Sequence, residues 1–305
     1  MRQLLLLIIV ASLFACSNKP KVTKTELKSF KMVEIPVMLT TSAQRAAFLV
    51  NHYWDNFDFK DTSYLSLPEI TEQALTGYLS ILPEVDKQTA NASLQSLIKC
   101  AEADTAMFSY FKKLTDKYLY NPNSPMRNED YYLAVLDKLI DSPLTNDAQK
   151  STLTFRRNLA MKNRVGDKAA DFVYTLASGA QAKMYNLKAD YTLLFFNNPG
   201  CHACEEIMEA MKSSQIIGNM LSENKLKVLA FYTDEDLAEW KRYQTTMSSF
   251  WINAYDKGTV LKERELYDLK AIPTLYLLDK QKNVLLKDAP FALVQQYLEQ
   301  SQFSQ

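Results

Sequence analysis

The chain has 305 residues, of which 47% are apolar, and its 35 basic side chains balance 35 acidic ones. This balance argues against a surface built to bind nucleic acid, and the length is enough for two domains. Four cysteines are too few for a disulfide framework, and two histidines with a single Cys-x-x-Cys pair argue against a structural zinc site.

The first predicted element is a secretory signal over residues 1–16. One arginine precedes the apolar run 4–14, which is too short to span a bilayer. The sequence Leu-Phe-Ala-Cys that ends at Cys16 resembles a bacterial lipoprotein box, although Phe14 departs from the small residue usual there. The resemblance implies cleavage before Cys16 and lipidation of that cysteine, and an ordinary secretory signal is the alternative. The polar, lysine-rich residues 17–31 are predicted to form a tether.

Residues 32–164 have the pattern of a helical domain. Apolar side chains recur at helical spacing, and Gly77 is the only glycine of this region, which suits helices better than the many turns of a β-domain. The predicted helices span residues 44–57, 69–82, 90–120, 130–140 and 145–163. Turn clusters around Pro122 and Pro143 separate the last three.

From residue 165 onward, short β-like runs alternate with helical ones. The predicted strands span residues 172–176, 182–185, 191–196, 227–232, 274–278 and 284–286, and the predicted helices span 202–214, 234–244 and 291–298. Such alternation predicts an α/β domain over residues 165–305. The chain as a whole is therefore predicted to be a two-domain α+β protein with the helical domain first.

The candidate redox site is the pair Cys201 and Cys204, between a predicted buried strand and a predicted helix. The free N–H groups and the dipole at a helix N-terminus favour a thiolate over a thiol. Cys204 recurs with Met208 and Met211 at the spacing of one helix face, which indicates a buried sulfur, and Cys201 precedes that face. We therefore expect Cys201 to be the exposed nucleophile and Cys204 the buried thiol that resolves a mixed disulfide.

Three motifs together make the second domain resemble the thioredoxin-like domains of the TlpA/ResA type, the membrane-tethered disulfide reductases of bacterial envelopes. The motifs are Val-Gly-Asp-Lys-Ala-Ala-Asp-Phe at 165–172, Cys-His-Ala-Cys at 201–204 and Ala-Ile-Pro-Thr at 271–274. The resemblance implies a thioredoxin-like fold, a cis peptide bond before Pro273 that faces the cysteines, and a backbone at Ile272 that positions a substrate segment. The helical region resembles only loosely the uncharacterised domains that precede such modules.

Departures from the family pattern leave the chemistry around the sulfurs open. His202 either stabilises the thiolate as an imidazolium or faces solvent and tunes the potential only slightly. Phe195 stands where thioredoxins carry a buried aspartate, and Ile207 where some reductases carry a glutamate. The proton acceptor for Cys204 is thus not assigned. Gly200 replaces the tryptophan that often precedes the first cysteine.

Two residues outside the pair have structural interpretations. Cys100 is predicted to be a buried free thiol, with pairing to another protein as the alternative. His52, which lies among aromatic residues, is predicted to pack in a core or an interface rather than to bind a ligand.

The combined interpretation is a lipid-anchored envelope protein that faces the periplasm and exchanges disulfides with other proteins, as a reductase or an isomerase. It is expected to need no cofactor or metal and to bind no nucleic acid, and a membrane-bound electron donor is implied if it turns over as a reductase. The rival interpretation is a binding or assembly protein, in which the helical domain holds a partner and the thioredoxin-like domain is a scaffold. The intact cysteine pair favours the enzyme, because function depends on the site rather than on the fold.

Overall fold

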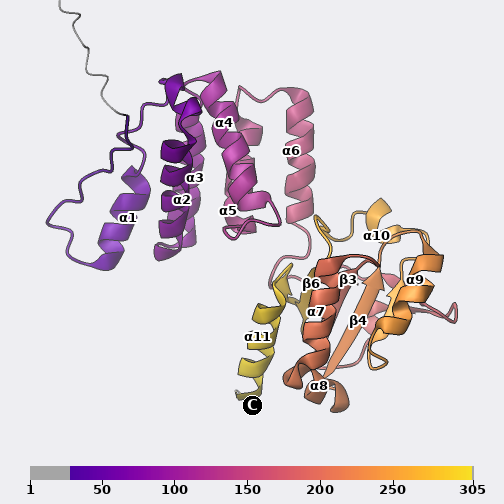
Figure 1. The fold of residues 1–305 in the computed structure, drawn as a ribbon. Coiled ribbons are helices and arrows are strands. Elements are labelled where there is room, and N and C mark those ends of the chain that lie inside the picture. The colour runs from indigo at the N-terminus through magenta and orange to yellow at the C-terminus, as the bar shows by residue number, and fades with distance from the viewer. Residues whose placement is uncertain (1–27, 304–305) are drawn as a thin grey trace, which may run out of the picture.

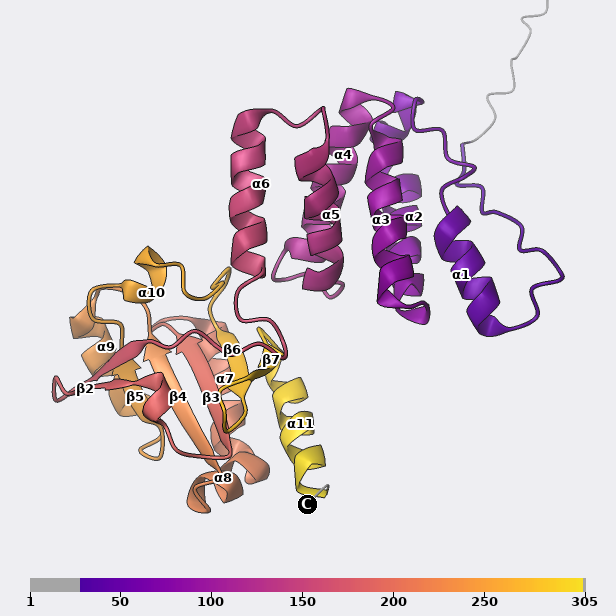
Figure 2. The same ribbon diagram turned by 180° about the vertical axis from the view of Figure 1, so that it is seen from behind.

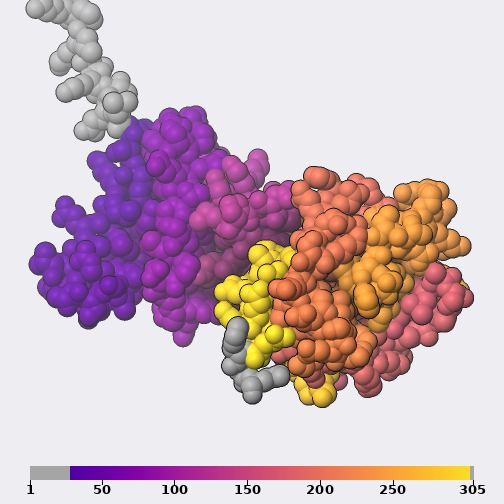
Figure 3. All heavy atoms as spheres, turned by 60° about the horizontal axis from the view of Figure 1, so that its bottom comes forward, coloured from indigo at the N-terminus to yellow at the C-terminus, as the bar shows by residue number. Residues whose placement is uncertain are grey.

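The computed structural model describes residues 28–303 and divides them into a helical domain and a domain built on a sheet (Figure 1). The predicted signal sequence, Cys16 and most of the predicted tether lie outside the described residues. Views from opposite sides place the helical bundle at one end of the molecule and the sheet at the other (Figure 2). The space-filling view shows two lobes in contact (Figure 3). The predicted two-domain α+β architecture is confirmed.

Amphipathic helices build the first domain, as predicted. They are α1 (Ser42–His52), α2 (Pro68–Ile81), α3 (Lys87–Ala101), α4 (Thr105–Thr115), α5 (Glu129–Asp141) and α6 (Asp147–Ala160). The prediction of one continuous helix over residues 90–120 is wrong. The chain breaks between α3 and α4 because the Asp104 carboxylate accepts hydrogen bonds from the N–H groups of Ala106 and Met107, which begins a new helix.

Aromatic side chains fill the core of the helical domain. The ring of Trp54 meets those of Tyr78 and Phe111 edge to face, with centroids 5.7 and 5.4 Å apart. Phe30 stacks on Tyr53 at 5.1 Å. Because Phe30 belongs to the predicted tether, the helical domain begins earlier in the chain than the sequence pattern indicated.

Two predictions of burial in the core of this domain are wrong, whereas the alternative that His52 packs in an interface with another protein stays a prediction. Cys100 is an exposed free thiol rather than a buried one, because it lies off the buried face of α3 that Leu97 and Ala101 share. His52 is also exposed, and its Nδ1 lies 2.7 Å from the carboxylate of Asp55. The reason is that α1 ends at His52, and the residues that follow it supply the buried rings.

The second domain is built on a seven-stranded mixed sheet with the strand order β2-β1-β5-β4-β3-β6-β7. Its strands are β1 (Val173–Leu176), β2 (Gln181–Lys183), β3 (Tyr191–Asn197), β4 (Leu226–Tyr232), β5 (Ile252–Tyr255), β6 (Thr274–Leu278) and β7 (Val284–Lys287). β3, β4 and β5 are parallel to one another, whereas β6 runs antiparallel to β3, and β7 to β6. The predicted strands are confirmed, and β5 was not predicted.

Helices cover the sheet. They are α7 (His202–Ser213), α8 (Gln215–Ser222), α9 (Leu237–Tyr243), α10 (Val260–Glu263) and α11 (Phe291–Phe303). α7, α8 and α11 pack on one face through Met208, Ile217 and Val294. The carboxyl ends of the parallel strands β3 and β4 lie at the edge of the sheet that faces the helical domain (Figure 1). Among residues 28–303, no helix combines the length and the apolar character that a membrane span needs.

A buried lysine joins the two domains. Lys287 Nζ, at the end of β7, donates to the backbone carbonyls of Ala160 and Lys162 at 2.8 and 2.7 Å, and it lies 2.7 Å from the Glu129 carboxylate. Burial lowers the pKa of Lys287, and the charge of Glu129 opposes that shift. The C-terminal end of α6 thus receives its hydrogen-bond donor from the other domain.

Two further contacts hold the same interface. The Arg127 guanidinium bonds the carboxylate of Asp288 at 2.7 Å and its backbone carbonyl at 2.6 Å. Just after α6, the Asn163 amide donates to the carbonyl of Leu266 at 2.8 Å, and its oxygen accepts from the N–H of Ala170 at 2.7 Å. The position of α6 relative to the sheet is therefore set by hydrogen bonds on both sides of the domain boundary.

Candidate redox site

The turn between β3 and α7 positions Cys201. Gly200 has a φ of +71°, a conformation that strains residues with a Cβ, and the space where a Cβ would lie is open. Glycine in place of the tryptophan usual in the family therefore forms the turn and leaves the approach to the first cysteine open. Cys201 follows in an extended conformation and is the N-cap residue of α7.

The two sulfurs form a disulfide, and the Cα atoms of Cys201 and Cys204 lie 5.2 Å apart. The backbone N–H of Cys204 points at Cys201 Sγ, with the two atoms 3.2 Å apart. After reduction, this N–H and the dipole of α7 favour a thiolate at Cys201. Cys204 is fully buried, whereas Cys201 is partly exposed. The structure thus places the expected nucleophile outside and the expected resolving thiol inside.

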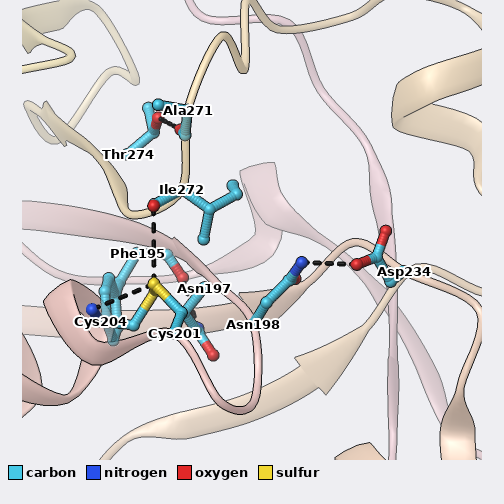
Figure 4. Close-up of a disulfide and its surroundings, with 9 residues drawn as sticks. All are labelled: Phe195, Asn197, Asn198, Cys201, Cys204, Asp234, Ala271, Ile272 and Thr274. Atoms are coloured by element: carbon cyan, nitrogen blue, oxygen red, sulfur yellow. Dashed lines mark hydrogen bonds between the residues drawn. A yellow bond between two sulfur atoms is a disulfide. The ribbon is translucent and has the colours of Figure 1, made fainter. Parts of the chain in front are cut away.

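The loop before β6 lies over the disulfide (Figure 4). The peptide bond between Ile272 and Pro273 is cis, as the resemblance implied. The carbonyl oxygen of Ile272 points at Cys201 Sγ from 3.5 Å, and the Thr274 hydroxyl donates to the carbonyl of Ala271 at 2.6 Å. A carbonyl oxygen accepts a hydrogen bond from a thiol but not from a thiolate, so this contact opposes the effect of the helix N-terminus.

His202 is directed into solvent. Its side chain is 85% exposed, and its Nε2 lies 3.2 Å from the carboxylate of Glu206 one turn along α7. This is the geometry of the solvent-facing alternative, and such an exposed pair contributes little to stability. Among the residues that the structure describes, no group of three or more His, Cys, Asp or Glu side chains is placed to hold a metal ion.

The surroundings of Cys204 are apolar. Phe195, which stands where thioredoxins carry an aspartate, is fully buried beside the pair (Figure 4). Ile207 is partly buried, and the nearby Glu205 and Glu206 are exposed on α7. An apolar environment favours the neutral thiol over the thiolate, which suits a resolving cysteine better than an attacking one.

A groove of about 390 Å³ adjoins the redox pair, and the sequence did not predict it. We call it the α6 groove, and the lining residues used below are Phe155, Leu159, Asn198, Leu261, Leu269 and Ile272. Asn198 and Ile272 lie at its redox end, where the Asn198 amide donates to Asp234 at 2.5 Å (Figure 4). Phe155 and Leu159 belong to α6, so both domains form this groove.

Comparisons with known proteins agree with this architecture. Residues 189–284 match the family model of thioredoxin-like domains, and residues 14–163 match that of a domain of unknown function, DUF5106. The crystal structure of a thioredoxin-like protein from Bacteroides caccae is 50% identical and superposes with a TM-score of 0.86, covering 90% of this chain and 99% of that one.

Two other solved structures match the second domain. The C-terminal domain of an uncharacterized protein from Bacteroides fragilis is 55% identical, covers 45% of this chain and 98% of that chain, and has a TM-score of 0.44. A domain of a possible thiol-disulfide isomerase from Cytophaga hutchinsonii is 25% identical, with corresponding coverages of 47% and 97% and a TM-score of 0.41. No curated protein matches the chain.

Proposed function

This chain belongs to the thioredoxin-like proteins, and from that premise we propose that it is a thiol-disulfide oxidoreductase that acts on disulfides of other proteins, as a reductase or an isomerase of the TlpA type. The observation that carries the proposal is the asymmetry of the pair. The sulfur of Cys201 is partly exposed at the N-terminus of α7, while Cys204 is buried behind it. A purely structural disulfide needs no such difference between its two sulfurs.

In the first step of the proposed reaction, the Cys201 thiolate attacks one sulfur of a substrate disulfide. The substrate S–S bond breaks, a mixed disulfide forms between the substrate and Cys201, and the leaving thiolate takes up a proton. The N–H of Cys204 stabilises the attacking thiolate before this step. The Ile272 carbonyl, 3.5 Å from Cys201 Sγ, marks where the substrate backbone passes.

In the second step, the Cys204 thiol loses its proton and attacks Cys201 Sγ. The mixed disulfide breaks, the substrate leaves as a dithiol, and the protein retains the Cys201–Cys204 disulfide, having lost two electrons. No cofactor takes part. Repeated turnover as a reductase requires a dithiol donor, which we propose to be membrane-bound, whereas an isomerase returns to the reduced state when the substrate forms its new disulfide.

A trapping experiment tests this function. Cys204→Ser in the full chain should accumulate mixed disulfides with substrate proteins through Cys201, because the resolving thiol is missing. Non-reducing electrophoresis and mass spectrometry identify the linked proteins. Both this variant and its matched control, the double variant Cys201→Ser, Cys204→Ser, are made in a Cys100→Ser background that removes the exposed thiol of α3, and the control should then trap nothing. If the single variant also traps nothing and the wild type fails to exchange with small disulfides, the rival scaffold function is the better one.

We also propose that the protein is a lipoprotein of the cell envelope that faces the periplasm. The support is the apolar run that ends at Cys16 and its resemblance to a lipoprotein box. Mass spectrometry of the mature protein should find a diacylglyceryl group on Cys16, and Cys16→Ala should prevent partitioning with membranes. An unmodified N-terminus at another residue would contradict the anchor.

A further inference from the structure

One wall of the α6 groove is an apolar face of the helical domain that residues 28–303 leave partly exposed. On α6, Leu153 and Ala160 are buried in the helical core. Phe155 and Leu159 are spaced four residues apart and line the groove instead. The Phe155 side chain is 47% exposed. This second apolar stripe of α6 faces the sheet domain across open space.

The opposite wall reaches the redox pair and combines apolar side chains with charged ones, which include Asp234, Lys262, Glu265, Asp268 and Lys270. Its aliphatic members are Leu261, Leu269 and Ile272. Ile272 is shared by the groove and the redox site, because its carbonyl oxygen lies 3.5 Å from Cys201 Sγ. A polypeptide that brings a sulfur to Cys201 therefore has the mouth of the groove beside its backbone. Successive residues of an extended segment advance by about 3.3 Å each, so a residue close to the cysteine reaches the groove.

Hydrogen bonds between the domains fix the position of α6, which forms the helical wall of the groove. Lys287 donates to the carbonyl of Ala160, which follows Leu159 at the end of α6, and to that of Lys162 just beyond the helix. Asn163 bonds Leu266 and Ala170 of the sheet domain. Since these contacts lie next to the groove, its width is set by the domain interface. A preformed apolar cavity binds one side chain more tightly than a surface that must first be ordered.

We propose that the helical domain selects the substrate of the redox pair by binding a bulky apolar side chain, from a residue near the substrate cysteine, between α6 and the Ile272 loop. This inference rests on the proposed thiol-disulfide exchange and assigns the helical domain a part in it. The occupant is a polypeptide disulfide with a large aliphatic or aromatic residue close to the reacting cysteine. The volume of about 390 Å³ is sufficient for such a side chain.

A peptide series tests the proposal on the reduced full chain. Each peptide carries one cysteine joined as a disulfide to 2-nitro-5-thiobenzoate, so that attack on the peptide sulfur forms the mixed disulfide with Cys201 and releases a coloured thiolate. A single phenylalanine is moved through the three positions on each side of the cysteine, with glycine elsewhere. At the best position the wild type should prefer the phenylalanine peptide over the all-glycine peptide by roughly tenfold in the second-order rate constant of thiolate release, measured in a single turnover.

Phe155→Ala should reduce this preference to about one, and Phe155→Leu should retain part of it. The matched control is Phe250→Ala, which removes an exposed phenylalanine (75%) in the loop before β5, outside the α6 groove, and should keep the tenfold preference. Circular dichroism checks that each variant is folded.

The outcomes separate the two proposals. A wild type that reacts with all peptides equally, or a Phe155→Ala variant with an unchanged preference, overturns the role of the helical domain and leaves the exchange function standing. A wild type that releases no thiolate from any peptide refutes the exchange function, and the inference fails with it.

Discussion

Two helices of the helical domain and the redox helix of the sheet domain begin in the same way, but with different atoms. In the helical domain, Asp104 accepts from two N–H groups at the start of α4, and Asn146 accepts from the N–H of Gln149 at the start of α6, both through oxygen. In the sheet domain, Asp236 caps α9 through oxygen too, but the N-cap of α7 is Cys201, and its sulfur accepts from the N–H of Cys204. One local arrangement therefore serves stability at the oxygen caps and reactivity at α7.

The difference between oxygen and sulfur at the N-cap explains why the reactive group lies at the start of α7. Unpaired N–H groups and a positive dipole end stabilise any acceptor at a helix start, and the effect is larger for an anion. An aspartate is already ionised at neutral pH, so the stabilisation contributes only to folding. A cysteine near its pKa gains thiolate from the same field, and it becomes a nucleophile. The substitution with the largest expected effect replaces the sulfur atom of Cys201 with oxygen.

Cys201→Ser converts the sulfur cap into an oxygen cap. Serine is among the preferred N-cap residues, so the variant should match reduced wild type in thermal stability to within a few degrees. In a Cys100→Ser background, which removes the exposed thiol of α3, exchange with a small aromatic disulfide should fall below detection, because a serine hydroxyl does not attack disulfides at neutral pH and Cys204 is buried. The control Cys100→Ser should keep the wild-type rate. Substantial exchange by Cys201→Ser would show that another sulfur attacks.

Alkylation compares the two sulfurs of the same pair. In a reduced Cys100→Ser background, which removes the exposed thiol on α3, iodoacetamide near neutral pH should modify Cys201 at least about tenfold faster than Cys204. The reasons are the helix N-terminus at Cys201 and the complete burial of Cys204. Peptide mass spectrometry over time measures both rates. Equal rates would mean that α7 opens readily at its first turn, and the distinction between the sulfurs would be lost.

Lys287→Met tests how far the hydrogen bonds at the C-terminal end of α6 stabilise the protein. The lysine donates to the carbonyl of Ala160, the last residue of α6, and to that of Lys162 just after the helix, and its Nζ lies 2.7 Å from Glu129. Its loss leaves these acceptors unpaired in a place where the lysine side chain is only 7% exposed, so the free energy of unfolding should fall by about 2 kcal/mol. Urea denaturation measures this. Lys225→Met is the matched control, because Lys225 pairs with Glu223 at the surface and should cost well under about 1 kcal/mol.

Asp104→Ala should have the smallest effect, a loss of about 1 kcal/mol in the free energy of unfolding. The carboxylate accepts from the N–H groups of Ala106 and Met107 at 2.8 and 3.0 Å, and alanine offers no acceptor. Asp104→Asn retains an oxygen cap and should lose at most a few tenths of that amount. If both variants unfold at the same urea concentration as the wild type, then the N-cap of α4 does not contribute to stability as its geometry indicates.

Features with a local signal were predictable from the sequence. The pair Cys201 and Cys204 lies in a strand–turn–helix segment whose pattern spans fewer than twenty residues, and the structure shows that segment. The break at Asp104 was missed, because an aspartate among helix-forming residues is compatible with both a helix surface and a cap. β5 was missed because four residues carry too weak a pattern, and its place depends on pairing with β1 and β4.

No local sequence pattern predicts the α6 groove or the interface between the domains. In the sequence, Phe155 is one of several apolar residues of an amphipathic helix. Only the arrangement of the two domains shows that it lines a groove with Ile272 instead of packing in the helical core. Exposure at Cys100 was mispredicted for a related reason, since a cysteine is commonly buried and the face of α3 that packs is set by neighbouring helices. Such features depend on contacts between residues far apart in the chain.

Because Lys287 lies near the end of the chain, its contact between the domains forms late in the synthesis of the protein. The helical domain leaves the ribosome first, since domains fold as the chain grows from its N-terminus. At that moment the carbonyl of Ala160 lacks its donor, because Lys287 is added 127 residues later. The C-terminal end of α6 therefore lacks this donor until β7 has been made. The α6 groove reaches its final width only when the sheet domain is nearly complete.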